Sequence, residues 1–328
     1  MKRLSLLVLG AAAVLVPGCG ERTLTSGLEE PLAVHDAQFI EGILPGSPPD
    51  QTLTPPRPTA ATTEVSFLRP NLANVAFFGW TTLDAVSVAA QIEGQGTGYW
   101  VTPTGPPDPA VQGEPVRVWR FVADFHESLP PGRHRLLVAA TDAEGRTGSQ
   151  VASTLCINRP VPDNGNACDP KKAPPELAIS LAWDRPVDLD LLVVTPSGDT
   201  VASRSPSKGL GPDQTINRNA LDKNLPGVGF LDRDSNEGCH IDGRQRETVV
   251  FPDRPEPGTY LVYVNLHDAC HEPNVRYTVS RFSRTASEPP APGSFSVIET
   301  DRTYGTLPAI QANGSTRIGT FVAELPVP

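Results

Sequence analysis

The sequence predicts an all-β protein made of two β-sandwich domains, and three observations support this. The 328 residues include 36 prolines and 28 glycines, which stand in turns between short apolar runs. After the N-terminal segment, no stretch keeps the i, i+3, i+4, i+7 apolar spacing of a helix over successive turns. Alternating runs recur with a turn about every ten residues, as in sandwiches. The length suits two domains.

The first 18 residues predict an export signal. Lys2 and Arg3 precede an apolar run over residues 4–16, and Cys19 follows a small residue. The apolar run is too short for a membrane span, which needs roughly 20 residues. We therefore expect a protein that leaves the cytoplasm.

The end of this segment, Val16-Pro17-Gly18-Cys19, resembles the lipobox of bacterial lipoproteins. The resemblance implies cleavage before Cys19, lipidation of that residue and attachment to a membrane. Gly20 stands where an aspartate would favour the inner membrane, so the outer membrane is expected. The alternative is an ordinary secretory signal in which Cys19 is incidental.

The charge balance bears on the partners. The formal net charge is −10, from 27 Lys and Arg against 37 Asp and Glu. Nucleic-acid phosphates are bound by clustered basic residues, so no nucleic-acid partner is expected. An acidic protein is suited to solubility and to divalent cations.

Residues 19–62 are polar and rich in proline, as in Pro45-Gly46-Ser47-Pro48-Pro49. This composition predicts a tether that lifts the folded domains from the membrane, with one early strand near residues 37–43. The alternative is that part of the segment packs on the first domain as an edge.

Residues 63–157 predict the first sandwich. Its expected strands lie at 64–68, 86–92, 117–123 and 133–140, with a last strand ending at Cys156. The hairpin that begins at Pro130-Pro131-Gly132 resembles bacterial immunoglobulin-like repeats, which implies an immunoglobulin-like domain.

Tyr99 and Trp100 are candidate ligand-binding residues. They follow the glycine-rich stretch 94–98, which predicts a loop. An exposed aromatic pair in such a loop would stack on the sugar rings of an envelope glycan. The alternative is that Trp100 is a core anchor of the sandwich.

Residues 158–176 predict a linker between the domains, with Cys156 just before it and Cys168 within it. An even number of cysteines remains besides Cys19, and an oxidising compartment favours their pairing. Of the three possible pairings we favour Cys156–Cys168 and Cys239–Cys270, because each pair lies within one local unit. The alternative is a zinc site made by Cys239, His240, His267, Cys270 and His271. Export argues against zinc, because the thiols would be oxidised first.

Residues 177–328 predict the second sandwich. Apolar residues alternate along two consecutive strands, at Leu177, Ile179, Leu181 and Trp183 and then at Leu189, Leu191 and Val193. Further strands are expected at 248–251, 259–266, 275–279 and 317–323. The polar stretch 203–229 has no periodicity and predicts a long loop.

Two acidic clusters in this domain are candidate metal ligands. Asp188 and Asp190 alternate along a strand, and Asp232, Asp234 and Asn236 alternate before a glycine. Several hard oxygens at alternate positions near a turn are the ingredients of a calcium site, although the spacing is not that of an EF-hand. Asp188, Asp190, Asp232 and Asp234 are therefore candidate ligands of calcium or another divalent ion, and no other cofactor is expected. The alternative is that these aspartates accept backbone N–H bonds in turns.

An ordered set of motifs runs through residues 177–280. It comprises Trp183-Asp184, Asp188-Leu189-Asp190-Leu191, Thr195-Pro196-Ser197-Gly198, Leu231-Asp232-Arg233-Asp234, Glu247 and the run from Pro257 to Asn265. This set resembles the YfaP-like family of exported bacterial β-sandwich domains of unknown function. Part of it is also similar to the jelly-roll-like accessory domains of secreted proteases. The resemblance implies a jelly-roll-like sandwich and an exported location, and it implies no reaction.

No motif of a zinc protease, a serine hydrolase or a phosphate-binding loop is found, so no enzyme is expected. We expect a non-catalytic cell-envelope lipoprotein, a binding or assembly module whose partner is an envelope glycan or protein. One alternative is a calcium-stiffened spacer. Another is a hydrolase that uses a cluster of His240, His267 and His271 with Asp268 and Glu247 nearby.

Overall fold

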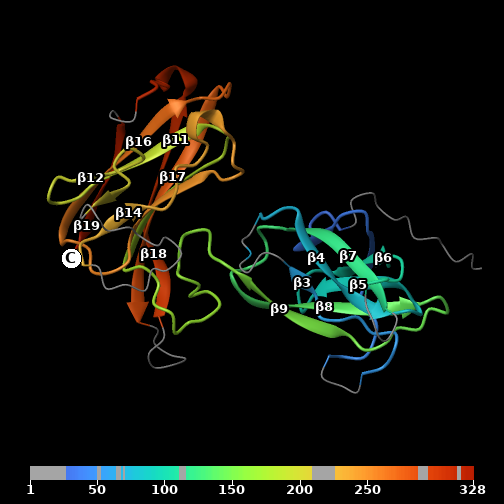
Figure 1. Cartoon of the computed structure of the whole chain (residues 1–328). Helices are drawn as coiled ribbons and strands as arrows, with labels where there is room; N and C mark the ends of the chain where they lie inside the picture. The colour runs from blue at the N-terminus through green and yellow to red at the C-terminus, as the bar shows by residue number, and fades with distance from the viewer. Residues whose placement is uncertain are drawn as a thin grey trace, which may run out of the picture.

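The computed structural model describes residues 27–49, 53–63, 68, 71–110, 116–208, 226–286, 295–315 and 319–328. Apart from two short 3₁₀ turns, the regular elements of these residues are β-strands, and they form two sandwiches (Figure 1). The predicted all-β fold with two sandwiches is therefore confirmed. The signal segment and Cys19 lie outside the described residues, as do most of the strand predicted at 64–68 and the centre of the loop predicted at 203–229.

The first sandwich consists of two antiparallel sheets. One has the order β1-β7-β4-β3, formed by Leu32–Val34, Val116–Phe125, Val75–Thr82 and Thr62–Thr63. The other has the order β2-β6-β5-β8-β9, formed by Gln38–Glu41, Gly98–Pro103, Ala85–Ile92, Gly132–Asp142 and Val151–Ile157.

Aromatic rings fill the core of the first sandwich. Alternate residues of β7 point inward, which places Trp119 and Phe121 side by side with 5.6 Å between ring centroids. Phe77 of β4 stacks on Phe121 at 5.3 Å and meets Phe125 edge-on at 6.1 Å. Trp119 is fully buried and its indole N–H donates to the carbonyl of Trp80 at 3.1 Å, so its polar atom is satisfied.

The predicted tether is wrong for part of residues 19–62. β1 and β2 come from this segment, and each forms one of the two outer strands of its sheet. Leu32 and Leu44 are only 3% and 2% exposed. Leu32 and Leu44 thus belong to the buried interior although they stand in a proline-rich segment. Proline is tolerated at sheet edges, where no ladder partner needs its N–H. The alternative that this segment packs as an edge describes the structure correctly.

The second sandwich also has two antiparallel sheets. The larger has the order β13-β14-β15-β10-β17-β18, formed by Ser207–Lys208, Gly229–Leu231, Arg246–Phe251, Leu177–Trp183, Asn274–Ala286 and Phe295–Pro308. The smaller has the order β12-β11-β16-β19, formed by Thr200–Val201, Asp188–Val194, Gly258–Asp268 and Thr320–Val327. The 3₁₀ turns are η1 (Glu237–Cys239) and η2 (Ala309–Gln311).

The predicted alternation in this domain is confirmed in its core. The inward residues of β10 and β11 are buried together with Tyr260, Val262, Val264 and Leu266 of β16. β18 was not predicted, because its outward residues are polar or exposed and its apolar alternation is weak.

Candidate cation site at the edge of the second sandwich

Polar side chains gather on the outer face of β11 and β16. Leu189 and Leu191 of β11 face the core, so Asp188 and Asp190 project from the opposite face. The strand pairing sets Asp190 opposite Asn265 of β16, with His267 nearby on the same face. Both aspartates are nevertheless buried, at 3% and 2% exposure.

The segment after β14 covers these aspartates. η1 lies against β11 and β16, and the N–H of Gly238 donates to a carboxylate oxygen of Asp188 at 2.8 Å. The same segment brings in Asp234. Asp188, Asp190 and Asp234 each offer an oxygen, and these three atoms lie within 4.8 Å of one another. Three of the four predicted calcium ligands therefore converge.

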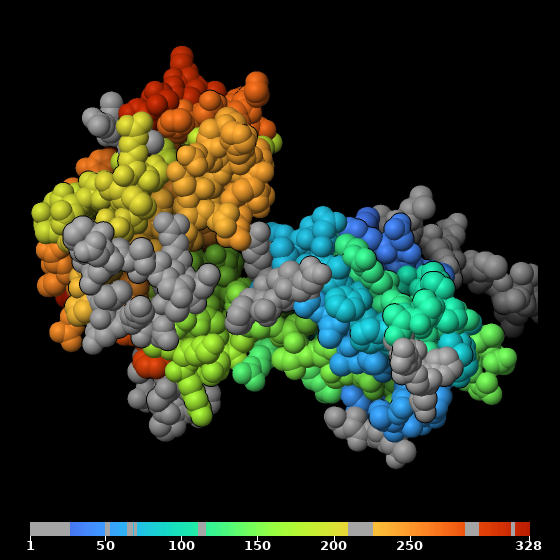
Figure 2. All heavy atoms as spheres, in the orientation of Figure 1, coloured from blue at the N-terminus to red at the C-terminus, as the bar shows by residue number. Residues whose placement is uncertain are grey.

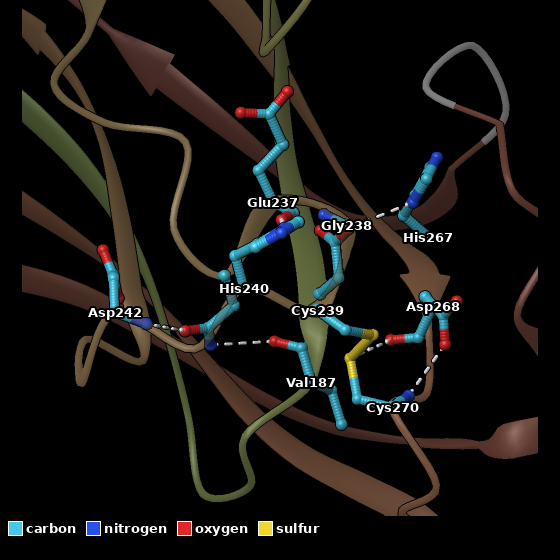
Figure 3. The surroundings of a disulfide bond; sticks show 11 residues. Val187, Glu237, Gly238, Cys239, His240, Asp242, His267, Asp268 and Cys270 are labelled. Atoms are coloured by element: carbon cyan, nitrogen blue, oxygen red, sulfur yellow. Dashed lines mark hydrogen bonds and ion pairs between the residues drawn. A yellow bond between two sulfur atoms is a disulfide. The ribbon is translucent and has the colours of Figure 1, made fainter.

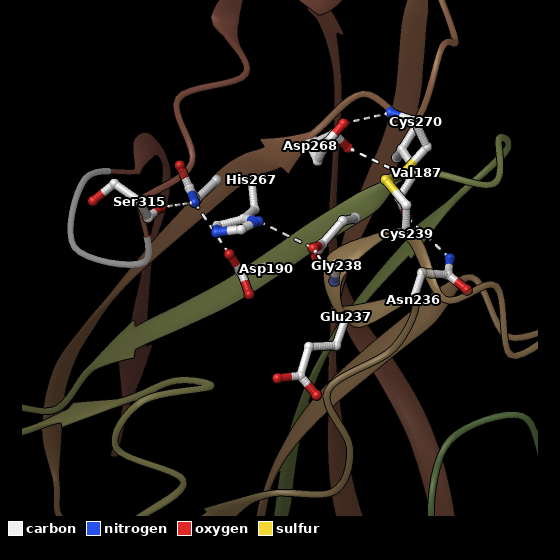
Figure 4. Close-up of polar contacts among 12 residues, drawn as sticks. Val187, Asp190, Asn236, Glu237, Gly238, Cys239, His267, Asp268, Cys270 and Ser315 are labelled. Carbon is white, nitrogen blue, oxygen red and sulfur yellow. Dashed lines mark hydrogen bonds and ion pairs between the residues drawn. A yellow bond between two sulfur atoms is a disulfide. The ribbon is translucent and has the colours of Figure 1, made fainter.

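Neighbouring donors orient two of the carboxylates (Figure 4). His267 Nδ1 lies 3.1 Å from Asp188 Oδ2, and Asn265 Nδ2 donates to Asp190 Oδ2 at 3.1 Å. The amide of Asn313 in turn donates to Asn265 Oδ1 at 2.8 Å and fixes that side chain. For Asp234 the situation differs. Its Oδ1 is buried and has no hydrogen-bond partner among the described residues.

Glu247 supports the site from the other sheet. This residue of β15 is fully buried, and its carboxylate accepts the N–H of Leu191 at 2.7 Å and of Ser235 at 3.1 Å. It therefore joins the edge of β11 to the segment that carries Asp234. Burial raises the pKa of Glu247 well above its usual value, and the charges of Asp190 and Asp234 raise it further.

The carboxylates disfavour each other's charge. Burial raises the pKa of Asp188 and of Asp190, and the charge of Asp190 adds to the shift at Asp188. Burial raises the pKa of Asp234 to about 6, with further contributions from the charges of Asp190, Glu237 and Asp188. A bound divalent cation would replace this repulsion by attraction and keep the carboxylates ionised.

The prediction that Asp232 joins the cluster is wrong. β14 ends at Leu231 and the chain then turns, so Asp232 and Asp234 do not share a strand face. Asp232 Oδ1 instead accepts the N–H of Thr248 at 2.7 Å, and burial raises its pKa to about 6. Asn236 is also occupied, because its side chain bonds the carbonyl of Val187 and the N–H of Asp242.

The second disulfide lies beside the site (Figure 3). Cys239 and Cys270 are bonded, which ties the segment carrying Asp234 to the end of β16. Cys156 and Cys168 form the other bond. Both predicted pairings are confirmed. The zinc alternative is wrong, because disulfide sulfurs cannot act as thiolate ligands.

The three histidines do not share one arrangement. His267 contacts Asp188, whereas His240 Nδ1 bonds the carbonyl of Glu237 within its own turn at 3.1 Å. His240 and His271 are exposed. No contact among the three histidines is found in the described residues.

Tyr99 and Trp100 do not form the expected exposed pair. They lie in β6, where successive side chains point to opposite faces. Trp100 packs on Phe39 at 5.1 Å between ring centroids, and its indole N–H donates to the carbonyl of Leu32 at 2.6 Å. Tyr99 packs in a small cluster around Leu44. The prediction of an aromatic sugar platform is therefore wrong, and Trp100 anchors the N-terminal strands instead.

Sequence reasoning missed Asn265 and His267 as neighbours of the calcium ligands, and it noted Glu247 only in the family resemblance and beside the histidine cluster. The available signal was the alternation of β16. Asn265 and His267 are polar at outward positions of an otherwise apolar strand, beside the aspartates of β11.

Comparison with known proteins leaves the family open. No family model matches the chain, and no curated protein matches it. Among solved structures, it is similar to the C-terminal domain of the AgI/II polypeptide BspA of Streptococcus agalactiae, with 9% identity and a TM-score of 0.21 over 76% of this chain and 99% of that one. A second structure of the same domain gives the same values.

A further likeness is to a structure described as manganese lipoxygenase of Gaeumannomyces graminis with part of zonadhesin of Komagataella pastoris. It has 12% identity and a TM-score of 0.18 over 82% of this chain and 98% of that one. Similarities this low carry no functional argument. Among the residues that the structure describes, no helix has the length and apolar character of a membrane span.

Proposed function

We propose that this chain is a non-catalytic, exported protein of the cell envelope, held at the outer membrane by a lipid on Cys19, that serves as a spacer or assembly module. In this proposal its second sandwich binds calcium through Asp188, Asp190 and Asp234. The convergence of these three carboxylates carries the calcium part. The two disulfides and the N-terminal sequence support export.

The spacing of the carboxylates fits one shared ion. Calcium lies about 2.3–2.6 Å from each oxygen ligand, so oxygens on opposite sides of the ion are roughly 5 Å apart. The limit of 4.8 Å among the three oxygens falls within that span. The unpaired Asp234 Oδ1 supplies an oxygen that no protein donor uses within the described chain.

The kind of donor favours calcium. The converging groups are carboxylates, which are hard ligands, and calcium accepts irregular arrangements completed by water. Magnesium requires near-octahedral geometry at about 2.0–2.1 Å and fits a loop-borne site less well. The ion would join β11 to the segment after β14, which stiffens the edge of the sandwich.

The test is a thermal melt of the purified protein in calcium and in chelator. Calcium at about 100 times its dissociation constant adds about 2.7 kcal/mol, which corresponds to a shift of roughly 5–10 °C for a domain of this size. Asp234→Asn should abolish the shift. It should also leave the chelated protein at least as stable as the wild type, because it removes one repelling charge.

Glu324→Gln is the matched control, since Glu324 is exposed on β19 and should leave the calcium shift intact. A wild-type melting temperature that is the same in calcium and in chelator would remove the calcium part of the proposal. The lipid part is tested by the mass of the processed N-terminus, which Cys19→Ala should leave without acyl chains.

A further inference from the structure

The linker between the sandwiches is folded into a compact turn. Asp163 is only 4% exposed, and its carboxylate accepts the N–H groups of Gly165 at 3.0 Å and Ala167 at 2.9 Å. Asn166 is 3% exposed, and its amide donates to the carbonyl of Lys172 at 3.0 Å. These bonds give residues 163–172 a defined shape.

The turn is fastened to the first sandwich. The Cys156–Cys168 disulfide joins its centre to the last strand, β9. Arg133 of the neighbouring strand β8 donates through Nε to the carbonyl of Cys168 at 2.5 Å. Two points of attachment thus reach the same residue from adjacent strands.

The same turn is fastened to the second sandwich at the beginning of β18. The N–H of Phe295 donates to the carbonyl of Pro170 at 2.9 Å, and the carbonyl of Phe295 accepts the amide of Asn166 at 3.1 Å. Both backbone polar groups of one strand residue are therefore held by the linker.

Arg284 adds a second attachment to this sandwich. Its side chain donates to the carbonyl of Pro174 at 3.1 Å, forms an ion pair with Glu176 and lies over the ring of Phe295 at 5.3 Å. Its backbone N–H donates to the carbonyl of Glu176 at 3.1 Å. The linker thus ends in firm contact with β17 and β18.

We propose that residues 158–176 form a rigid connection, here called the bracket, that fixes the orientation of the two sandwiches. The Cys156–Cys168 disulfide is the covalent bond that holds the bracket to the first sandwich. The two lobes joined by this yellow-green segment are visible in Figure 2. The attachments to the second sandwich begin at Asn166, close to the disulfide. Without the disulfide, the described hydrogen bonds from the bracket to the first sandwich are those from Arg133 to Cys168, at the turn, and from Asn158 to Leu68, at the start of the linker.

Reduction is the event that would release the bracket. A dithiol breaks the sulfur–sulfur bond by supplying two electrons and two protons, and it becomes a cyclic disulfide while Cys156 and Cys168 become thiols. The two sandwiches then move independently on a flexible linker. This inference needs neither the bound cation nor the lipid of the proposed function.

Limited trypsin digestion of the full, processed chain tests the bracket, because Lys171 and Lys172 are exposed within it. In the oxidised protein the turn should resist cleavage. A 12-residue separation between the cysteines predicts that the double variant Cys156→Ala/Cys168→Ala is cut there on the order of 100-fold faster. The matched control Cys239→Ala/Cys270→Ala should leave the rate of cleavage at the linker unchanged.

Energy transfer between dyes gives the second measurement. Dyes are carried by non-canonical residues at Ile43 and Ile310, which are 90% and 91% exposed on different sandwiches. The distribution of energy-transfer efficiencies should be narrow in the oxidised protein and broad after addition of dithiothreitol. In the Cys156→Ala/Cys168→Ala variant this distribution should be broad with and without dithiothreitol. Equal linker cleavage in both double variants, or one narrow distribution under all conditions, would overturn the proposal.

Discussion

The two sandwiches share an architecture and differ in how they treat buried carboxylates. In the first sandwich, Asp142 is 3% exposed and pairs with Arg146 and with backbone N–H groups. Burial acts to raise the pKa of Asp142, yet these partners bring it below the usual value. In the second sandwich, the pKa values of Asp190 and Asp234 are raised. A single buried carboxylate with its own charged partner is typical of a structural role, whereas several buried carboxylates that lie close together are typical of an ion-binding site.

The largest expected effect tests the stacked aromatic rings in the core of the first sandwich. Trp119→Ala removes a fully buried indole and should cost about 3–5 kcal/mol of the free energy of unfolding. Hydrogen exchange of amides in each sandwich would show loss of protection confined to the first. The control Trp80→Ala, at a residue 38% exposed, should cost less than about 1 kcal/mol. Equal costs at the two positions would contradict the assignment of the core.

The second largest expected effect concerns the edge of the second sandwich, where Glu247 holds the segment after β14. Glu247→Ala leaves the N–H groups of Leu191 and Ser235 without their acceptor in a buried place, which should cost about 2–4 kcal/mol. Urea unfolding measures this. The loss should appear in chelator as well as in calcium, because it does not depend on the ion. An unchanged free energy of unfolding would show that Glu247 is not needed to hold the segment after β14.

The pH dependence sharpens the contrast between the two kinds of carboxylate. Asp232 and Asp234 have pKa values raised to about 6, so the folded protein binds more protons than the unfolded chain between about pH 4 and 6. In chelator, the stability of the second sandwich should therefore rise as the pH falls from 7 to 5, by a few degrees in melting temperature. Calcium should weaken or reverse this trend, since it holds Asp234 ionised. A melting temperature that falls over this interval in chelator would be the contrary result.

The smallest effect concerns the N-terminal strands. Trp100→Phe removes the hydrogen bond to the carbonyl of Leu32 while keeping a ring against Phe39, and it should cost about 1 kcal/mol. Hydrogen exchange should speed up at β1 and β2 and remain unchanged in the second sandwich. Unaltered exchange at β1 would mean that Trp100 does not anchor this segment.

The sequence predicted those parts of the fold in which local pattern and burial agree. β10, β11 and β16 alternate cleanly, so their faces were assigned correctly, and the cysteine pairs lie within local units. β1 was missed because its few apolar residues stand in a proline-rich stretch, and β18 because most of its outward side chains are exposed. Three of the predicted calcium ligands converge, whereas Asp232 points elsewhere. The direction of its side chain depends on the turn after β14, and the alternation of residues along a strand does not predict the path of a turn.

The bond from Leu191 to Glu247 has a consequence beyond this site. Within the described residues, β12 pairs with β11 only at Val193 and Val194, and the N–H of Leu191 bonds to Glu247 instead of to a neighbouring strand. A strand N–H group that is exposed and lacks a ladder partner is a point where a strand of another molecule can add and start aggregation. The N–H of Leu191 is closed to another molecule, because Glu247 accepts it in a fully buried place and η1 lies against β11, which would help keep copies of the protein separate when they are crowded together.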